Sequence, residues 1–142
     1  MDTVIFWYAL ATVILFVKMT GISVYQAQQR FKYKSYKSPE DARAVGVAPA
    51  AEELPQVQRA ARAWLNDLEN IPAFWALGWV YILVDAPALA APWLFMIFTV
   101  ARIVHTYCHI NALQPWRALA FFAGLLMMLV MSVMILTAIF VN

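Results

Sequence analysis

The sequence predicts an all-α integral membrane protein, a single domain over residues 1–142 built as a bundle of four transmembrane helices. Of the 142 residues, 64% are apolar and only 13% are charged, whereas soluble domains carry about 25% charged residues. A bilayer core of about 30 Å needs about 20 mostly apolar residues per helix, so the chain can supply four spans with short connections. The expected spans are about 4–25, 60–84, 93–113 and 116–141, with a cytoplasmic loop over about 30–58.

Basic residues gather between the first two expected spans. Seven of the ten Lys and Arg residues lie there or at the start of the second span: Arg30, Lys32, Lys34, Lys37, Arg43, Arg59 and Arg62. The positive-inside rule places this loop in the cytoplasm, with both termini outside. Basic residues beside a membrane contact anionic membrane lipids, so no nucleic-acid partner is expected. The compact loops and the lack of a eukaryotic retention signal favour a bacterial inner membrane.

The first two spans follow from apolar stretches and turn signals. The first stretch is interrupted only by Lys18, and the absence of Lys or Arg before it argues against a cleaved signal peptide. In the loop, Ser38-Pro39 predicts the start of a short helix, because Pro suits the first helical position. A longer helix is expected from Pro55 into the second span. Pro72 should kink this helix without ending it, because neighbouring helices can satisfy the freed carbonyl.

The third and fourth spans are separated by a clear break. The third is expected to run from Trp93 to Leu113, where Gln114-Pro115 stops the helix. The fourth, 116–141, is the longest apolar run, and Arg117 is its only charged residue. These features complete an up-and-down arrangement of four helices.

Two polar stripes at membrane depth are the main functional signal. At 100° per residue, four side chains of the second expected span fall inside a wedge of about 80°. They are Arg59, Arg62, Asn66 and Glu69, and the third expected span carries a matching stripe of Arg102, His105 and His109. Asp67 points away from the first stripe and is expected to make a contact between helices. A charge near the bilayer centre costs about 3 kcal/mol, so such residues face a protein interior or a wet cavity.

These stripes have more than one interpretation. Singly, each charged residue fits a buried ion-pair network that holds the bundle together. Together, the cations exceed the single carboxylate of Glu69, which favours an anionic ligand that carries carboxylates. His105 and His109 have the spacing of metal ligands, but no third ligand is evident beside them and no metal is expected. Cys108 is the only cysteine, so no intrachain disulfide is possible, and a buried structural thiol is expected.

A combined pattern over about residues 30–121 resembles the MAPEG family, the membrane-associated proteins in eicosanoid and glutathione metabolism. It comprises Arg59-x-x-Arg62-Ala63-x-x-Asn66-Asp67-x-Glu69, Ala101-Arg102-x-x-His105-Thr106, Gln114-Pro115-Trp116-Arg117 and the loop motif Pro39-Glu40-Asp41. The resemblance implies a homotrimer of four-helix protomers that binds glutathione between neighbouring subunits near the cytoplasmic side. It also implies a lipophilic electrophile as the second substrate.

The resemblance also assigns residues to the glutathione site. Arg117 matches the catalytic arginine at the thiol. The expected binding residues are Arg30, Arg62, Asn66, Glu69, Arg102, His105 and His109. The implied activity is that of a glutathione transferase, with peroxidase or prostaglandin-isomerising activity as a further option. Four positions depart from the pattern of the prostaglandin branch, namely Leu65, His109, Ala118 and Phe121, and they count against prostaglandin isomerisation. The retained Arg117 favours transferase or peroxidase chemistry over loss of activity.

Two other functions stay open from the sequence. The protein could be a non-catalytic membrane module that binds lipid or glutathione, but the retained Arg117 argues for catalysis. A small transporter is a weaker alternative, because the polar residues cluster near one side and do not line a full crossing.

Overall fold

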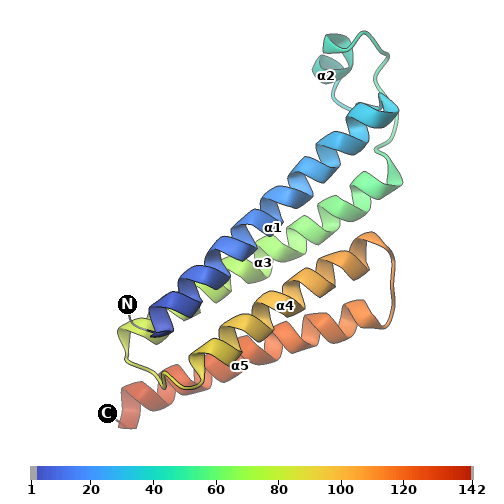
Figure 1. The fold of residues 1–142 in the computed structure, drawn as a ribbon. Coiled ribbons are helices and arrows are strands. Elements are labelled where there is room, and N and C mark those ends of the chain that lie inside the picture. The colour runs from blue at the N-terminus through green and yellow to red at the C-terminus, as the bar shows by residue number, and fades with distance from the viewer. Residues whose placement is uncertain (1–2, 142) are drawn as a thin grey trace.

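The computed structural model describes residues 3–141, and this part of the chain is entirely helical apart from its connections. Its helices are α1 (Thr3–Tyr33), α2 (Pro39–Ala44), α3 (Pro55–Leu83), α4 (Ala91–Ile110) and α5 (Trp116–Val141). Figure 1 shows four long helices that run alongside one another, with the short α2 beyond the end of α1. Helix α4 packs against α1, α3 and α5, and α3 also contacts α1 and α5.

Local signals in the sequence set most helix boundaries. Helices α2 and α3 begin at Pro39 and Pro55, each with Pro in the first turn, as predicted. Ser38 precedes α2 without a side-chain capping bond. Helix α3 continues through Pro72, as expected for a helix supported by its neighbours.

Helix α4 ends earlier than the sequence indicated. The third span was expected to reach residue 113, but the helix stops at Ile110. Ala112 adopts a left-handed conformation with φ of 56°, and the Leu113 N–H donates to the Cys108 carbonyl at 2.8 Å. This is the hydrogen-bond pattern of a Schellman ending, which hydrophobicity does not reveal. Cys108 itself is free and buried, as predicted.

Three helices of the described chain, α1, α4 and α5, are long and apolar enough to cross a membrane. Helix α3 has 29 residues, a comparable length, but its first half carries Arg59, Arg62, Asp67 and Glu69. The protein is therefore an all-helical membrane protein. The count of four spans and the trimer stay predictions.

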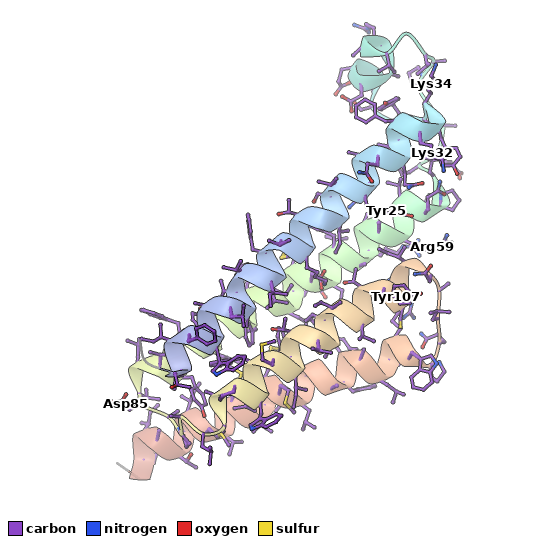
Figure 2. The ribbon with its side chains drawn as sticks, in the orientation of Figure 1. Tyr25, Lys32, Lys34, Arg59, Asp85 and Tyr107 are labelled. Atoms are coloured by element: carbon purple, nitrogen blue, oxygen red, sulfur yellow. The ribbon has the colours of Figure 1, made fainter. Side chains whose placement is uncertain are left out.

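The two ends of the bundle differ in character. Figure 2 shows Lys32, Lys34 and Arg59 at the end near α2, and Asp85 at the opposite end, where α1 begins and α5 ends. In the half near Asp85, aromatic side chains pack against one another within the apolar core. The rings of Phe74 and Phe98 stack at 4.2 Å between centroids. The basic end therefore adjoins the half of the bundle that holds the polar stripes.

Candidate functional site

Arg102 on α4 is the centre of the buried polar cluster. Its side chain is fully buried, and its Nη1 donates to Asn66 Oδ1 on α3 at 3.0 Å. Its Nη2 donates to the Phe121 carbonyl on α5 at 3.4 Å. The rings of Phe98 and Phe121 lie 5.8 and 5.6 Å from the guanidinium carbon, close enough for cation–π attraction. The two polar stripes therefore meet at Asn66 and Arg102.

A second buried group joins α1 to α3 and α4. Lys18 Nζ donates to Asp67 Oδ2 in a buried ion pair, and Thr106 Oγ1 donates to the same oxygen at 3.3 Å. The prediction that Asp67 makes a contact between helices is confirmed. Its partner was missed by the sequence analysis. The available signal was the position of Lys18 as the lone charge in an apolar stretch.

The two histidines lie beside the Arg102 cluster. His105 is buried and His109 is half-buried, and their rings lie 5.5 Å apart, edge to face. His105 also lies 6.3 Å from the Phe121 ring. Within residues 3–141, Nδ1 of both histidines and Nε of Arg102 have no hydrogen-bond partner. In the same range, no group of three His, Cys, Asp or Glu side chains could hold a metal ion.

The rest of the α3 stripe faces outward. Arg59, Arg62 and Glu69 are exposed on the protomer, so the structure does not bring them to Arg102. Arg59 Nε donates to the carbonyl of Ile110 at the end of α4, at 3.1 Å. A cavity of about 530 Å³ lies on this side. Its lining is Lys37, Glu52, Glu53, Gln58, Ala61, Arg62 and Leu65.

Arg30 near the end of α1 is held by the loop that precedes α3. Its Nε and Nη2 both donate to Glu53 Oε2, at 3.0 and 2.5 Å. Glu53 is itself fixed, because its Oε1 accepts from the Leu54 N–H at 3.2 Å and its carbonyl accepts from Gln58 Nε2 at 3.0 Å. The guanidinium of Arg30 is thus already bound to a carboxylate of its own chain.

Arg117 lies in the first turn of α5 and is half-buried. With the Gln114 amide turned so that its oxygen faces the guanidinium, this oxygen accepts from Arg117 Nε at 3.0 Å and from Nη2 at 2.5 Å. Arg117 and Arg62 both interact electrostatically with His109. The catalytic candidate and the outward stripe therefore belong to one electrostatic neighbourhood, at the basic end of the bundle.

These features define a class of protein: a helical membrane protein with a cation-rich polar site at one end of its bundle. The model of the MAPEG family matches residues 8–137, and the chain belongs to this family. The resemblance found in the sequence is thereby confirmed.

Relatives that are similar in sequence include proteins named microsomal glutathione S-transferase 1 and proteins named prostaglandin E synthase. Microsomal glutathione S-transferase 1 of Mus musculus is 41% identical over 119 residues, 80% of this chain and 76% of the relative. The Homo sapiens protein of the same name is 38% identical over 128 residues, 87% and 83% of the two chains. Prostaglandin E synthase of Bos taurus is 34% identical over 115 residues, 80% and 75% of the two chains.

Proposed function

We propose that this protein is a membrane-bound glutathione transferase that holds glutathione as a thiolate for attack on lipophilic electrophiles, with hydroperoxides as alternative substrates. The observation that carries the proposal is the excess of cations around the polar site. Lys18 and Arg102 are buried with the single carboxylate of Asp67, and Arg62 and Arg117 add two further charges nearby. An anionic ligand would balance this excess. The names of the relatives supply glutathione as its identity.

Three nitrogen atoms without partners in residues 3–141 lie within the site, beside the residues that we propose bind the ligand. The side-chain nitrogens Arg102 Nε, His105 Nδ1 and His109 Nδ1 are buried without partners in the described chain, although buried polar atoms are normally hydrogen-bonded. Glutathione offers two carboxylates and two peptide groups to such atoms. On α3, Arg62 and Asn66 would bind its polar backbone, and Glu69 suits its ammonium group.

Arg117 would supply the chemistry. A free thiol has a pKa of about 8.5, and the thiolate is the nucleophile. A guanidinium stays charged at any working pH, and it favours the anionic form of a nearby sulfur. Each unit of pKa depression corresponds to about 1.4 kcal/mol. The thiol proton would pass to solvent, the thiolate sulfur would form a bond to the electrophilic carbon, and the leaving group would depart with its electron pair.

The same arrangement supports a proposal for assembly and location. Arg62, Leu65 and Glu69 are exposed on the protomer beside a polar cavity, so a neighbouring copy in a homotrimer would complete the site. The basic end supports a cytoplasmic site, and the compact loops are the reason to place the protein in a bacterial inner membrane. The second substrate would then enter from the bilayer.

One feature favours the alternative of a non-catalytic lipid-binding module. A wholly apolar groove of about 490 Å³ runs between α4 and α5. Its lining is Trp93, Met96, Ile97, Val100, Ala101, Val104, Trp116, Leu119, Ala120 and Ala123. Such a groove matches an acyl chain. Under this alternative, glutathione would bind without being consumed.

The thiolate absorbance of bound glutathione tests the proposal. Wild-type protein in mild detergent should give a saturable thiolate signal, and Arg117→Ala should lose it. Conjugation of 1-chloro-2,4-dinitrobenzene should fall by about tenfold or more, the effect of one unit in the pKa of the thiol. Arg43→Ala, on the exposed side of α2, is the matched control and should behave as wild type. An Arg117→Ala protein that conjugates at the wild-type rate would refute the assignment, and binding without turnover would favour the lipid-binding module.

A further inference from the structure

Gly124 on α5 lies directly against the buried guanidinium of Arg102. A Cβ built at this position would lie 3.1 Å from Arg102 Nη2, 3.2 Å from Nε and 3.4 Å from the guanidinium carbon. Ordinary van der Waals contact begins at about 3.5 Å between carbon atoms. Even the smallest side chain at position 124 would therefore press on the guanidinium.

Arg102 has little freedom to move away from such a methyl group. Its Nη1 is bound to Asn66 Oδ1 at 3.0 Å on the α3 side. The Phe98 and Phe121 rings flank the guanidinium, and the whole side chain is excluded from solvent. A shift of a few tenths of an ångström would disturb both hydrogen bonds of the guanidinium, the one to the Phe121 carbonyl on α5 and the one to Asn66 Oδ1 on α3.

We infer that Gly124 is a positioning residue for the ligand site: the missing side chain lets Arg102 lie between α4 and α5 and orient Asn66 on α3. The inference rests on the proposed function, because Asn66 and Arg102 are the residues expected to bind glutathione. Gly124 makes no contact with the ligand. It acts by fixing where the guanidinium sits.

The test compares Gly124→Ala with Gly21→Ala. Gly21 lies inside α1, and a Cβ there would meet nothing within 4 Å, so both variants make the same change in a helix interior. Gly124→Ala should raise the Kd of glutathione by about threefold to tenfold, the effect of weakening one hydrogen bond to a charged group. Gly21→Ala should stay within about twofold of wild type, as expected for an exposed site.

Two further readouts separate positioning from general damage to the fold. Gly124→Ala should raise the KM for glutathione while kcat at saturating glutathione changes by less than about twofold, because Arg117 is untouched. The methyl group of Gly124→Ala would press on the planar guanidinium of Arg102, and a lysine side chain has no such group. In an Arg102→Lys background, Gly124→Ala should therefore cause no further loss of glutathione affinity. Equal losses in the two backgrounds, or wild-type affinity in folded Gly124→Ala, would overturn the inference.

Melting temperatures of double variants test the contact between Gly124 and Arg102 without any ligand, and they therefore test this inference separately from the proposed function. If the methyl breaks the bond to Arg102, Asn66→Ala should lower the melting temperature less in the Gly124→Ala protein than in wild type. Additive effects would show that Gly124 does not control this bond. A wild-type protein that fails to bind glutathione would instead refute the proposed function, and with it the ligand role of Gly124, while the double variants would still test the contact itself.

Discussion

Replacing Glu53 by Gln should increase the affinity of the protein for glutathione. Glu53 Oε2 accepts two hydrogen bonds from the guanidinium of Arg30. Arg30 is also the residue that the family resemblance assigns to ligand binding from α1. A carboxylate of glutathione would have to displace Glu53 to reach the same two donors. The internal carboxylate therefore competes with the ligand, and a neutral amide at position 53 would compete less.

The solvent exposure of the Arg30–Glu53 pair determines how large the change in glutathione affinity should be. The side chains of Arg30 and Glu53 are 34% and 18% exposed. Hydrogen bonds to charged groups contribute about 1.5–3 kcal/mol, but exposed ion pairs contribute only about 0–1 kcal/mol. We therefore expect the Arg30–Glu53 interaction, which is partly exposed, to contribute about 1 kcal/mol. If the ligand no longer had to break this interaction, the Kd of glutathione would fall about fivefold.

Calorimetric titration of the solubilised protein with glutathione measures this change. Glu52→Gln is the matched control, because Glu52 lines the same cavity and its substitution removes the same charge beside the Arg30–Glu53 pair. Glutathione monoethyl ester, which lacks one carboxylate charge, should gain less from Glu53→Gln if Arg30 binds that carboxylate. An unchanged or weaker affinity in a Glu53→Gln protein that melts like wild type would refute the competition.

Two substitutions in the bundle should lower stability for different reasons. Asp67→Asn leaves the buried Lys18 without its counter-ion, so chemical unfolding should show a loss of about 3–5 kcal/mol. Lys18→Met combined with Asp67→Leu should recover most of it, and a double variant as unstable as the single one would contradict this account. Gly78→Ala would place a methyl 2.5 Å from Tyr8 Cε2 and should cost about 1–3 kcal/mol in thermal unfolding. Adding Tyr8→Leu should remove that cost, and an undiminished loss would show another cause.

The sequence predicts the fold where the signals are local. Pro39 and Pro55 mark helix starts because their fixed φ suits the first turn, and the structure begins helices there. The predicted end of α4 was wrong by three residues, because the observed end depends on the backbone conformation of Ala112. An alanine gives no signal for a left-handed conformation, which is usually supplied by Gly or Asn. Composition indicates a membrane protein, but α3 is polar enough that its crossing of the membrane stays a prediction.

The sequence predicted which site residues share a face of one helix, but it did not predict the contacts between helices. Helical spacing placed Asn66 on a polar stripe and turned Asp67 toward another contact. In the structure Asn66 accepts a hydrogen bond from Arg102, and Asp67 accepts one from Thr106. Spacing within one helix does not reveal which residue of another helix will face it. The Lys18–Asp67 and Arg30–Glu53 pairs join residues 49 and 23 positions apart, so they emerge only from the packing of α1. The catalytic role assigned to Arg117 and all the assigned ligand-binding roles, those of Arg62 and Glu69 included, stay predictions.

The polar half of the bundle is poorly suited to stability and well suited to binding. Lys18, Asp67 and Arg102 are withdrawn from water, and replacing such ionic groups by well-packed apolar side chains is often neutral or stabilising. Gly124 likewise gives up a helix-favouring methyl beside Arg102. The aromatic half, with its stacked Phe74 and Phe98, supplies the apolar packing that can carry these costs. The aromatic half fixes the helices relative to one another. The polar half holds Arg102 Nε and the Nδ1 atoms of His105 and His109 without partners in the described chain, and we propose that an anionic ligand binds beside them.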